Sequence, residues 1–174
     1  SETLFDDDDL DFFDPIEEDG KLEDLKVKWL DSEWAKKTPV RLEVPFETVL
    51  AGVLIRGRID AVYKTENGYE VVDWKTGKVK DDSRQLKLFA LYIFHTKTKI
   101  EKCHTSFEWI TKGKSTKETY HRSDIEDLWQ EFIPDLKRFK IAHNEDKWDK
   151  KPSGLCKEYC PVTNCEFNGK YKGD

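Results

Sequence analysis

The sequence predicts a mixed α/β fold in which a central β-sheet is flanked by α-helices. Several segments alternate apolar and polar residues, as strands with one buried face do, and others repeat apolar residues at helical intervals. A chain of 174 residues with 37% hydrophobic and 13% aromatic content is long enough to bury one ordinary core. We therefore expect a single α/β domain.

The first half of the chain predicts a helix followed by three strands. The helix is expected over residues 21–37, with an apolar stripe made of Leu22, Leu25, Trp29, Leu30 and Trp34. Strands are expected at 40–47, 53–63 and 69–76. Glu66-Asn67-Gly68 precedes the third strand and predicts a hairpin turn, because Asn and Gly tolerate positive φ.

The second half predicts two helices separated by one strand. Ser83 is expected to cap a helix that ends near His95 and buries Leu86, Phe89, Ala90 and Ile93. Residues 100–111 alternate again and predict a strand. Ser123 and Glu126 form a capping-box pattern, which predicts a long amphipathic helix through Phe139.

Charge divides the chain into an acidic tail and a basic body. The formal net charge is -6, but ten of the 36 acidic residues lie in positions 1–19, which contain no Lys or Arg. The other 26 face 30 basic residues, so the body carries about +4 and can hold phosphates. We expect 1–19 to be a flexible acidic tail, 20–150 the folded core, and 151–174 a cysteine-containing segment packed on that core.

The sequence also predicts a cytoplasmic protein. It has no run of roughly 18 apolar residues that could span a membrane and no signal segment at its start. Because it contains no methionine and starts at Ser1, we expect further residues to precede it in the full-length protein.

Charged residues interrupt apolar strands in residues 58–77. Asp73 and Lys75 are two apart on a predicted strand, so both side chains project from one face of the sheet. If Asn67-Gly68 forms the turn, Asp60 faces Lys75; if Glu66-Asn67 forms it, Asp60 faces Asp73. Both registers predict that the three charged groups meet on one exposed side of the hairpin.

Two carboxylates this close repel each other unless a cation neutralises them, and hard oxygen ligands suit Mg²⁺ or Mn²⁺. Such an ion would polarise a phosphate and acidify a water molecule, while Lys75 would orient that water or stabilise negative charge. This is the chemistry of phosphodiester hydrolysis. The spacing alone is equally compatible with an ordinary cross-strand ion pair.

An ordered set of motifs resembles the RecB-like nucleases of the PD-(D/E)XK superfamily. The motifs lie between about residues 38 and 95 and are Gly57-x-Ile59-Asp60, Val72-Asp73-Trp74-Lys75-Thr76-Gly77 and Gln85-Leu86. The resemblance implies a restriction-endonuclease-like core and a divalent-metal-dependent deoxyribonuclease, more an exonuclease than an endonuclease, acting in DNA processing, recombination or repair. Similar domains occur fused behind helicases and as small phage proteins.

The resemblance also implies roles for individual residues. Asp60 and Asp73 would be metal ligands, the backbone carbonyl of Trp74 a third ligand, Lys75 the catalytic lysine, and Gln85 the motif glutamine that contacts the site. Asp73 stands where many relatives have Glu.

Two family positions differ in this chain. Phe89 replaces the tyrosine that follows the Gln-Leu motif. No histidine precedes His95, so the upstream metal ligand of many relatives would be an acidic residue. Glu43 and Glu47 are the candidates, and we take Glu43.

Three cysteines, Cys156, Cys160 and Cys165, lie in a short segment flanked by Gly and Pro. They resemble the C-terminal cysteines of RecB-like nucleases that hold a 4Fe-4S cluster together with an upstream fourth cysteine. Here the fourth ligand lies outside this sequence, is Cys103, or is not a cysteine. A zinc ion bound with His143 and a set of free thiols are the alternatives.

The sequence thus predicts a metal-dependent DNA nuclease whose acidic tail docks on a helicase or another DNA-processing protein, or mimics DNA. The alternative, from a different class, is a catalytically inactive nucleic-acid-binding or scaffold module with a metal-binding cysteine knuckle.

Overall fold

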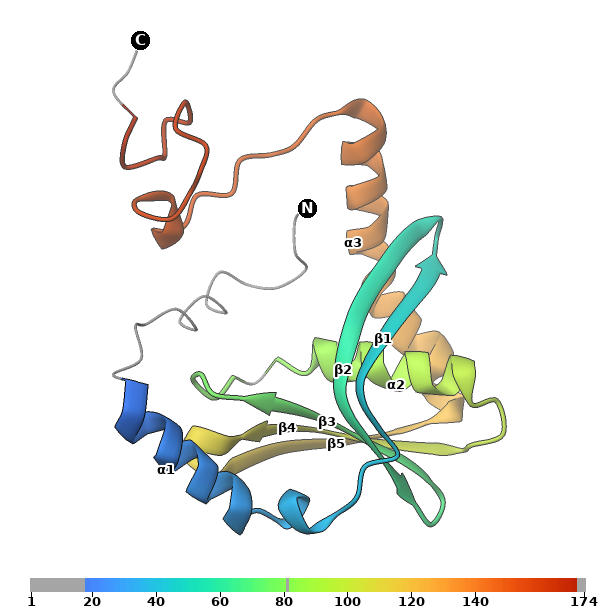
Figure 1. Cartoon of the computed structure of the whole chain (residues 1–174). Helices are drawn as coiled ribbons and strands as arrows, with labels where there is room; N and C mark the ends of the chain where they lie inside the picture. The colour runs from blue at the N-terminus through green and yellow to red at the C-terminus, as the bar shows by residue number, and fades with distance from the viewer. Residues whose placement is uncertain (1–17, 81, 172–174) are drawn as a thin grey trace.

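The computed structural model describes residues 18–80 and 82–171 of the chain. Their centre is a five-stranded sheet in the order β1-β2-β3-β4-β5 (Figure 1). The strands are β1 (Arg41–Leu50), β2 (Val53–Thr65), β3 (Gly68–Lys75), β4 (Lys102–Trp109) and β5 (Lys114–His121). Neighbours pair antiparallel except β3 and β4, which are parallel. The predicted mixed sheet is confirmed.

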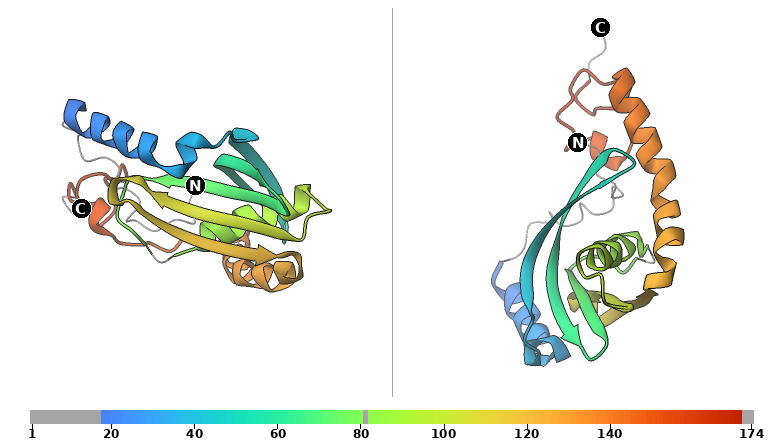
Figure 2. Two further views of the ribbon diagram at one scale, coloured as in Figure 1. Left: turned by 90° about the horizontal axis from the view of Figure 1, so that it is seen from below. Right: turned by 90° about the vertical axis from the view of Figure 1, so that its right-hand side faces the viewer.

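Helices cover both faces of this sheet (Figure 2). The parallel strands β3 and β4 are connected through α2 (Arg84–Thr96), which lies on one face with α3 (Ile125–Glu145) beside it. The other face is covered by α1 (Glu18–Asp31) and a short 3-10 helix, η2 (Glu33–Lys36). Parallel strands are typically buried in this way, because their connection must cross a face of the sheet.

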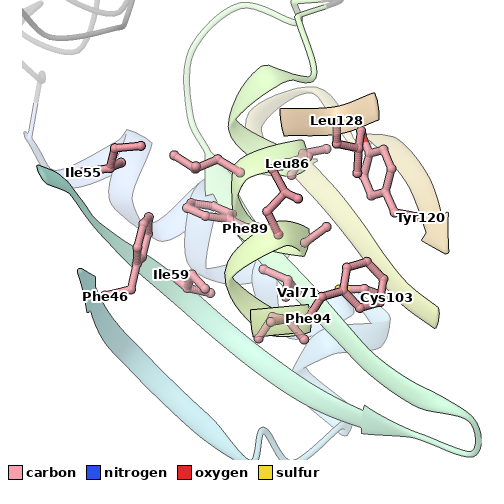
Figure 3. Close-up of a cluster of buried hydrophobic side chains, with 14 of the residues drawn as sticks. Phe46, Ile55, Ile59, Val71, Leu86, Phe89, Phe94, Cys103, Tyr120 and Leu128 are labelled. Atoms are coloured by element: carbon pink, nitrogen blue, oxygen red, sulfur yellow. The ribbon is translucent and has the colours of Figure 1, made fainter. Parts of the chain in front are cut away.

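The larger hydrophobic core lies between the sheet and α2 (Figure 3). The predicted helical face is buried there, since Leu86, Phe89, Ala90 and Ile93 are all at most 5% exposed. Phe46 of β1 packs edge to face on Phe89 with ring centroids 5.9 Å apart. Burial of side chains of this size contributes about 1.5–3 kcal/mol each, so α2 is held firmly against the sheet.

A smaller core lies on the opposite face. It consists of Trp34, Ala61, Tyr63 and Val72, with Trp29 and Trp74 packed against it. The predicted first helix is interrupted at Ser32, which divides it into α1 and η2. Leu22 and Leu30 are exposed, so the two tryptophans rather than the whole predicted stripe attach this helix to the sheet.

The strand β5 is not predicted by the sequence pattern. This strand reads Lys114-Ser115-Thr116-Lys117-Glu118-Thr119-Tyr120-His121 and buries one residue, Tyr120. It lies at the edge of the sheet and, among the residues that the structure describes, pairs with β4 alone. An edge strand of polar residues has no apolar alternation, so the hydrophobic pattern could not reveal it.

The two predicted helix starts have different outcomes. Ser83 is the N-cap residue of α2, as predicted, but its side chain makes no capping bond, and the Arg84 amide donates instead to Asp82 Oδ1 at 2.8 Å. The predicted capping box of Ser123 and Glu126 is wrong. Ahead of α3 a 3-10 turn, η4 (Arg122–Asp124), is closed by Asp124, whose Oδ2 accepts from the His121 amide at 2.8 Å. Local side-chain competition for the same amides decides such caps, and sequence spacing does not rank the competitors.

β1 and β2 form a long hairpin that curves out of the sheet (Figure 2). The paired residues of β1 and β2 keep a constant offset, from Leu50 opposite Val53 to Arg41 opposite Val62. Within this hairpin Glu43 adopts φ 49°, the left-handed region that non-glycine residues seldom occupy. Leu42 is exposed on this edge strand, so the predicted alternation of β1 is only partly expressed as burial.

The C-terminal segment follows α3 and contains the short helix η5 (Gly154–Cys156). Asn168 is buried there, and its side chain donates to the Cys160 carbonyl at 2.9 Å while accepting from the Lys170 amide at 2.8 Å. The predicted packing of 151–174 on the core stays a prediction. Residues 1–17 of the predicted acidic tail lie outside the described residues.

No helix in residues 18–80 or 82–171 has the length and apolar character needed to cross a membrane.

Candidate active site

The hairpin of β2 and β3 decides between the two registers that the sequence leaves open. Thr65 pairs with Gly68 and Ala61 with Val72, so Glu66-Asn67 forms the turn. Continuing this offset by one residue sets Asp60 opposite Asp73. Directly opposed residues of antiparallel strands have Cα atoms about 4.5–5.5 Å apart, which brings the two carboxylates to one place on the sheet.

Asp60 contacts the backbone of β3. Its Oδ2 accepts a hydrogen bond from the Trp74 amide at 2.9 Å. The bond fixes the Asp60 carboxylate beside the peptide that links Asp73 to Trp74. The Trp74 carbonyl that the family resemblance names as a ligand belongs to the next peptide along β3.

Asp73, Lys75 and Gln85 contact one another pairwise. The Lys75 ammonium lies 3.0 Å from Asp73 Oδ2 and donates to Gln85 Oε1 at 3.0 Å. The Gln85 amide nitrogen in turn donates to Asp73 Oδ1 at 3.1 Å. Gln85 is in the first turn of α2, so the crossover helix completes a site that the strands begin.

The sequence predicts that the site lies on an exposed side of the hairpin, and this prediction is wrong. Asp73 is only 4% exposed because α2 covers this face of the sheet, and the larger core lies on the same side. Trp74 and Val72 do point to the opposite face, but into the smaller core. A buried carboxylate is costly unless it is paired and hydrogen-bonded, and Lys75 and Gln85 provide both kinds of contact.

Glu43 lies near Asp60 in register but is directed elsewhere. The offset of the neighbouring pairs puts Glu43 level with Asp60, but the β1–β2 ladder skips this position, where Glu43 has a positive φ. Its carboxylate accepts from Arg58 Nη1 at 3.2 Å, and both side chains are exposed. Among residues 18–80 and 82–171, no three His, Cys, Asp or Glu side chains are grouped so that they could hold a metal ion.

The donors present still fit a magnesium-like ion. Mg²⁺ keeps several water ligands and is commonly held by one or two protein carboxylates, so a set of three acidic side chains is not required. Asp60 and Asp73 are hard oxygen donors from adjacent strands, and the Asp73 carboxylate is already placed by Gln85. These residues suit Mg²⁺ or Mn²⁺ better than a soft metal.

The cysteines are divided between two places. Cys103 is fully buried in the larger core, and burial raises the pKa of its thiol to about 12. Cys156, Cys160 and Cys165 are half-buried free thiols in the C-terminal segment. Cys156 Sγ accepts from the Ser153 amide at 3.4 Å. His143 stacks near Phe139 on α3, with ring centroids 6.2 Å apart.

Beside the site lies an ion-pair network that the sequence did not predict. Arg84, adjacent to Gln85, pairs with Asp135 of α3, and Arg138 pairs with the same carboxylate. One turn further along α2, Lys87 pairs with Glu131 at 2.7 Å. The two contacts between α2 and α3 join residues 51 and 44 positions apart, so no local spacing signal could have found them.

The fold and this site define a class of protein: a mixed α/β core in which two carboxylates and a lysine lie on two adjacent strands of the sheet beside a crossover helix. Comparison with known families agrees. The sequence profile of the PD-(D/E)XK nuclease superfamily matches residues 17–165, which is most of the chain. The chain belongs to the PD-(D/E)XK nuclease superfamily.

Individual relatives match over shorter stretches. The chain is 38% identical over 79 residues to the Gene 69 protein of Mycobacterium phage D29, covering 45% of this chain and 29% of that protein. Among solved structures, that of SSO0001 aligns with 21% sequence identity and a TM-score of 0.33, over 66% of this chain and 57% of that one. The chain thus spans under a third of the length of its phage relative.

Proposed function

We propose that this chain hydrolyses phosphodiester bonds in DNA, using a divalent ion held by Asp60 and Asp73. Membership of the nuclease superfamily supports hydrolysis of nucleic acid. For these residues, the proposal depends on one observation: Lys75 and Gln85 both contact the Asp73 carboxylate and also contact each other. A buried carboxylate held this way on a strand beside a second one is preorganised for a cation.

Each side chain has a distinct part in the proposed reaction. A bound Mg²⁺ or Mn²⁺ would supply Lewis acidity toward the phosphate and a more acidic water. Asp60 and Asp73 would hold it, with the Trp74 carbonyl as a further donor. Lys75 would orient the attacking water or stabilise charge on the phosphate oxygens, and Gln85 would fix the positions of both Asp73 and Lys75.

The finer parts of the proposal rest on the motif resemblance. It favours a RecB-like deoxyribonuclease, an exonuclease acting in DNA processing, recombination or repair. Glu43 is our proposed third acidic ligand, and its support is that it lies between Leu42 and Val44, which pair with the two neighbours of Asp60 in β2. In the described conformation it pairs with Arg58, so ligation requires that this exposed pair opens.

Cleavage of labelled single-stranded and double-stranded DNA, with Mn²⁺ or with EDTA, tests the proposal. Asp73→Asn keeps the shape of the side chain and removes its charge, so we expect a loss of at least about 100-fold in rate. We expect Lys75→Ala to lower the cleavage rate by a comparable factor. Gln85→Ala should lower it by about 10- to 100-fold, the range for groups that orient ligands. The matched control is Asp127→Asn, an exposed aspartate of α3.

Cleavage that survives in Asp73→Asn or in EDTA would overturn the proposal. If the wild-type chain binds DNA but never cleaves it, the inactive binding module becomes the better description. The Lys75–Asp73 pair would then be an ordinary ion pair.

A 4Fe-4S cluster or a zinc ion at Cys156, Cys160 and Cys165 stays a proposal supported by cysteine spacing. Iron and zinc analysis of the purified chain tests it, together with a visible absorption spectrum. Protein that contains neither metal after anaerobic purification would identify these residues as free thiols.

A further inference from the structure

The end of the sheet nearest the candidate site is basic. Lys75 ends β3 beside Trp109 of β4, and Trp109 pairs with Lys114 of β5. Neighbouring strands lie about 4.8 Å apart, so Lys75 and Lys114 are separated by roughly 10 Å along this edge. Lys112 lies in the turn between β4 and β5. We refer to Lys75, Lys112 and Lys114 as the basic end.

Two of these lysines are available to an anion. Lys112 and Lys114 are exposed, and within the described part of the chain neither forms an ion pair. Lys75, in contrast, is engaged with Asp73. An anionic group could therefore bind Lys112 and Lys114, beside the site, without displacing an existing ion pair of either lysine.

An aromatic pair lies near the same end of the sheet, on the face that α1 covers and opposite the Lys75 side chain. Trp74 directly precedes Lys75, and Trp29 of α1 packs on it edge to face with ring centroids 4.5 Å apart. Both rings keep part of their surface exposed while they pack against the smaller core. A ligand that is both acidic and aromatic could therefore contact the exposed ammonium groups of the basic end and, across the end of the sheet, the exposed part of these rings.

The first 17 residues of the chain have this chemistry. They contain eight acidic residues and no Lys or Arg, with Asp6-Asp7-Asp8-Asp9 in one run. Phe5, Phe12 and Phe13 lie on either side of that run. The segment is a short polyanion with aromatic side chains.

α1 tethers this segment close to the basic end. The Lys28 ammonium donates to the Thr111 carbonyl at 3.3 Å, so α1 passes directly beside the β4–β5 turn (Figure 1). From Lys28 back to Glu18 the helix extends about 15 Å. Seventeen residues can reach up to about 56 Å when extended, so the segment can return to the basic end with slack.

We propose that residues 4–13 dock on the basic end of their own chain, with the aspartates on Lys112 and Lys114 and the phenylalanines against Trp29 and Trp74. A tether of this length gives an effective concentration in about the millimolar range, so individually weak contacts suffice. The docked segment occupies the surface that DNA phosphates would use and acts as a competitive, salt-sensitive inhibitor. The docking itself does not depend on the proposed function; the inhibition does.

Zero-length carbodiimide cross-linking of the full chain tests the docking without DNA. This reagent joins a carboxylate to an amine only where the two are in contact. We expect intramolecular links from Asp6–Asp11 to Lys112 and Lys114, found by mass spectrometry of the monomer and lost at high salt. The double variant Lys112→Glu, Lys114→Glu should abolish them, whereas Lys64→Glu, Lys102→Glu, at the other end of the sheet, should not.

Links spread evenly over exposed lysines would overturn the proposal. Links confined to dimers would also overturn it, because they would show that the segment docks on a second copy of the chain.

DNA binding measured in EDTA separates the docking from the proposed function. Replacing the five aspartates from Asp6 to Asp11 by asparagine should raise affinity for an oligonucleotide about 5- to 10-fold at low salt, with the gain shrinking as salt rises. An unchanged affinity in a chain that binds DNA would overturn the inhibition. A chain that shows the cross-links but binds no DNA at all would refute the proposed function and leave the docking intact.

Discussion

At the scale of single residues, the site depends on one carboxylate placed where burial opposes its charge. Asp73 is 4% exposed and is held by Lys75 and Gln85 on its two oxygens. Removing either partner would leave a buried charge inadequately compensated, which is more costly than losing a surface ion pair. The side chains around Asp60 and Asp73 are therefore constrained by folding as well as by any chemistry they perform.

Gly57, in the first of the resembling motifs, has a steric role. A Cβ atom at this position would lie 2.5 Å from ring atoms of Phe46, which is 3% exposed and cannot move freely. We predict that Gly57→Ala destabilises the fold by about 1–3 kcal/mol, the usual cost of overpacking. Urea unfolding measures this, with Gly154→Ala as the control because nothing lies within 4 Å of its added Cβ. Equal midpoints for the two variants would contradict the prediction.

The four cysteines should react in two classes. Burial in the core raises the pKa of Cys103 to about 12, so its reactive thiolate is scarce in the folded chain. Cys156, Cys160 and Cys165 are partly accessible. In metal-free protein we expect a thiol reagent to label these three quickly and Cys103 only after unfolding, as peptide mapping would show. Rapid labelling of Cys103 in the native state would mean that β4 is not packed as described.

At the scale of elements, the site joins a hairpin to a helix. β2 and β3 supply Asp60, Asp73 and Lys75, whereas Gln85 comes from the first turn of α2. The position of α2 is in turn fixed by the larger core and by ion pairs to α3. α3 thus influences the site although it contributes no side chain to the contacts around Asp73.

The Arg84–Asp135 pair should make the α2–α3 contact dependent on pH. A hydrogen bond from Arg84 is the main cause that lowers the pKa of Asp135, and Arg138 adds to it. A lowered folded-state pKa means that the stabilisation is complete above the ordinary aspartate pKa of about 3.9 and is lost as pH falls through the folded value. We predict that Asp135→Asn costs about 1 kcal/mol at neutral pH and progressively less below about pH 4. Unfolding free energies across this range, with Asp127→Asn as control, test the sign: a difference that grows on acidification would refute it.

At the scale of the whole molecule, a bound metal should stabilise the fold. The two carboxylates that repel each other lie on adjacent strands near the centre of the sheet, so an ion between them favours the folded state. At a metal concentration 100 times the dissociation constant the gain is about 2.7 kcal/mol, or roughly 5–10 °C in melting temperature.

Thermal unfolding with Mn²⁺ and with EDTA measures this gain. The increase should vanish in Asp73→Asn and persist in Asp127→Asn. An equal increase in both variants would place the metal elsewhere on the chain.

Much of this molecule could be predicted from the order of its residues. Period-two and helical patterns predicted β1 to β4, α2 and the core face of α2, because burial on one side imposes those patterns directly. Spacing alone placed Asp73 and Lys75 on one face of a strand. The motifs also predicted the superfamily to which the chain belongs.

Other features were decided only by the tertiary structure. β5 has no apolar alternation because it is an edge strand, and it forms only because β4 offers hydrogen bonds to it. The turn at Glu66-Asn67, the burial of Asp73 under α2, and the Arg84–Asp135 pair all arise from the packing of distant segments. Periodicity along one element determines which side chains share a face, and this can be read from the sequence. Whether those side chains are exposed or buried depends on which other elements pack on that face in the folded chain.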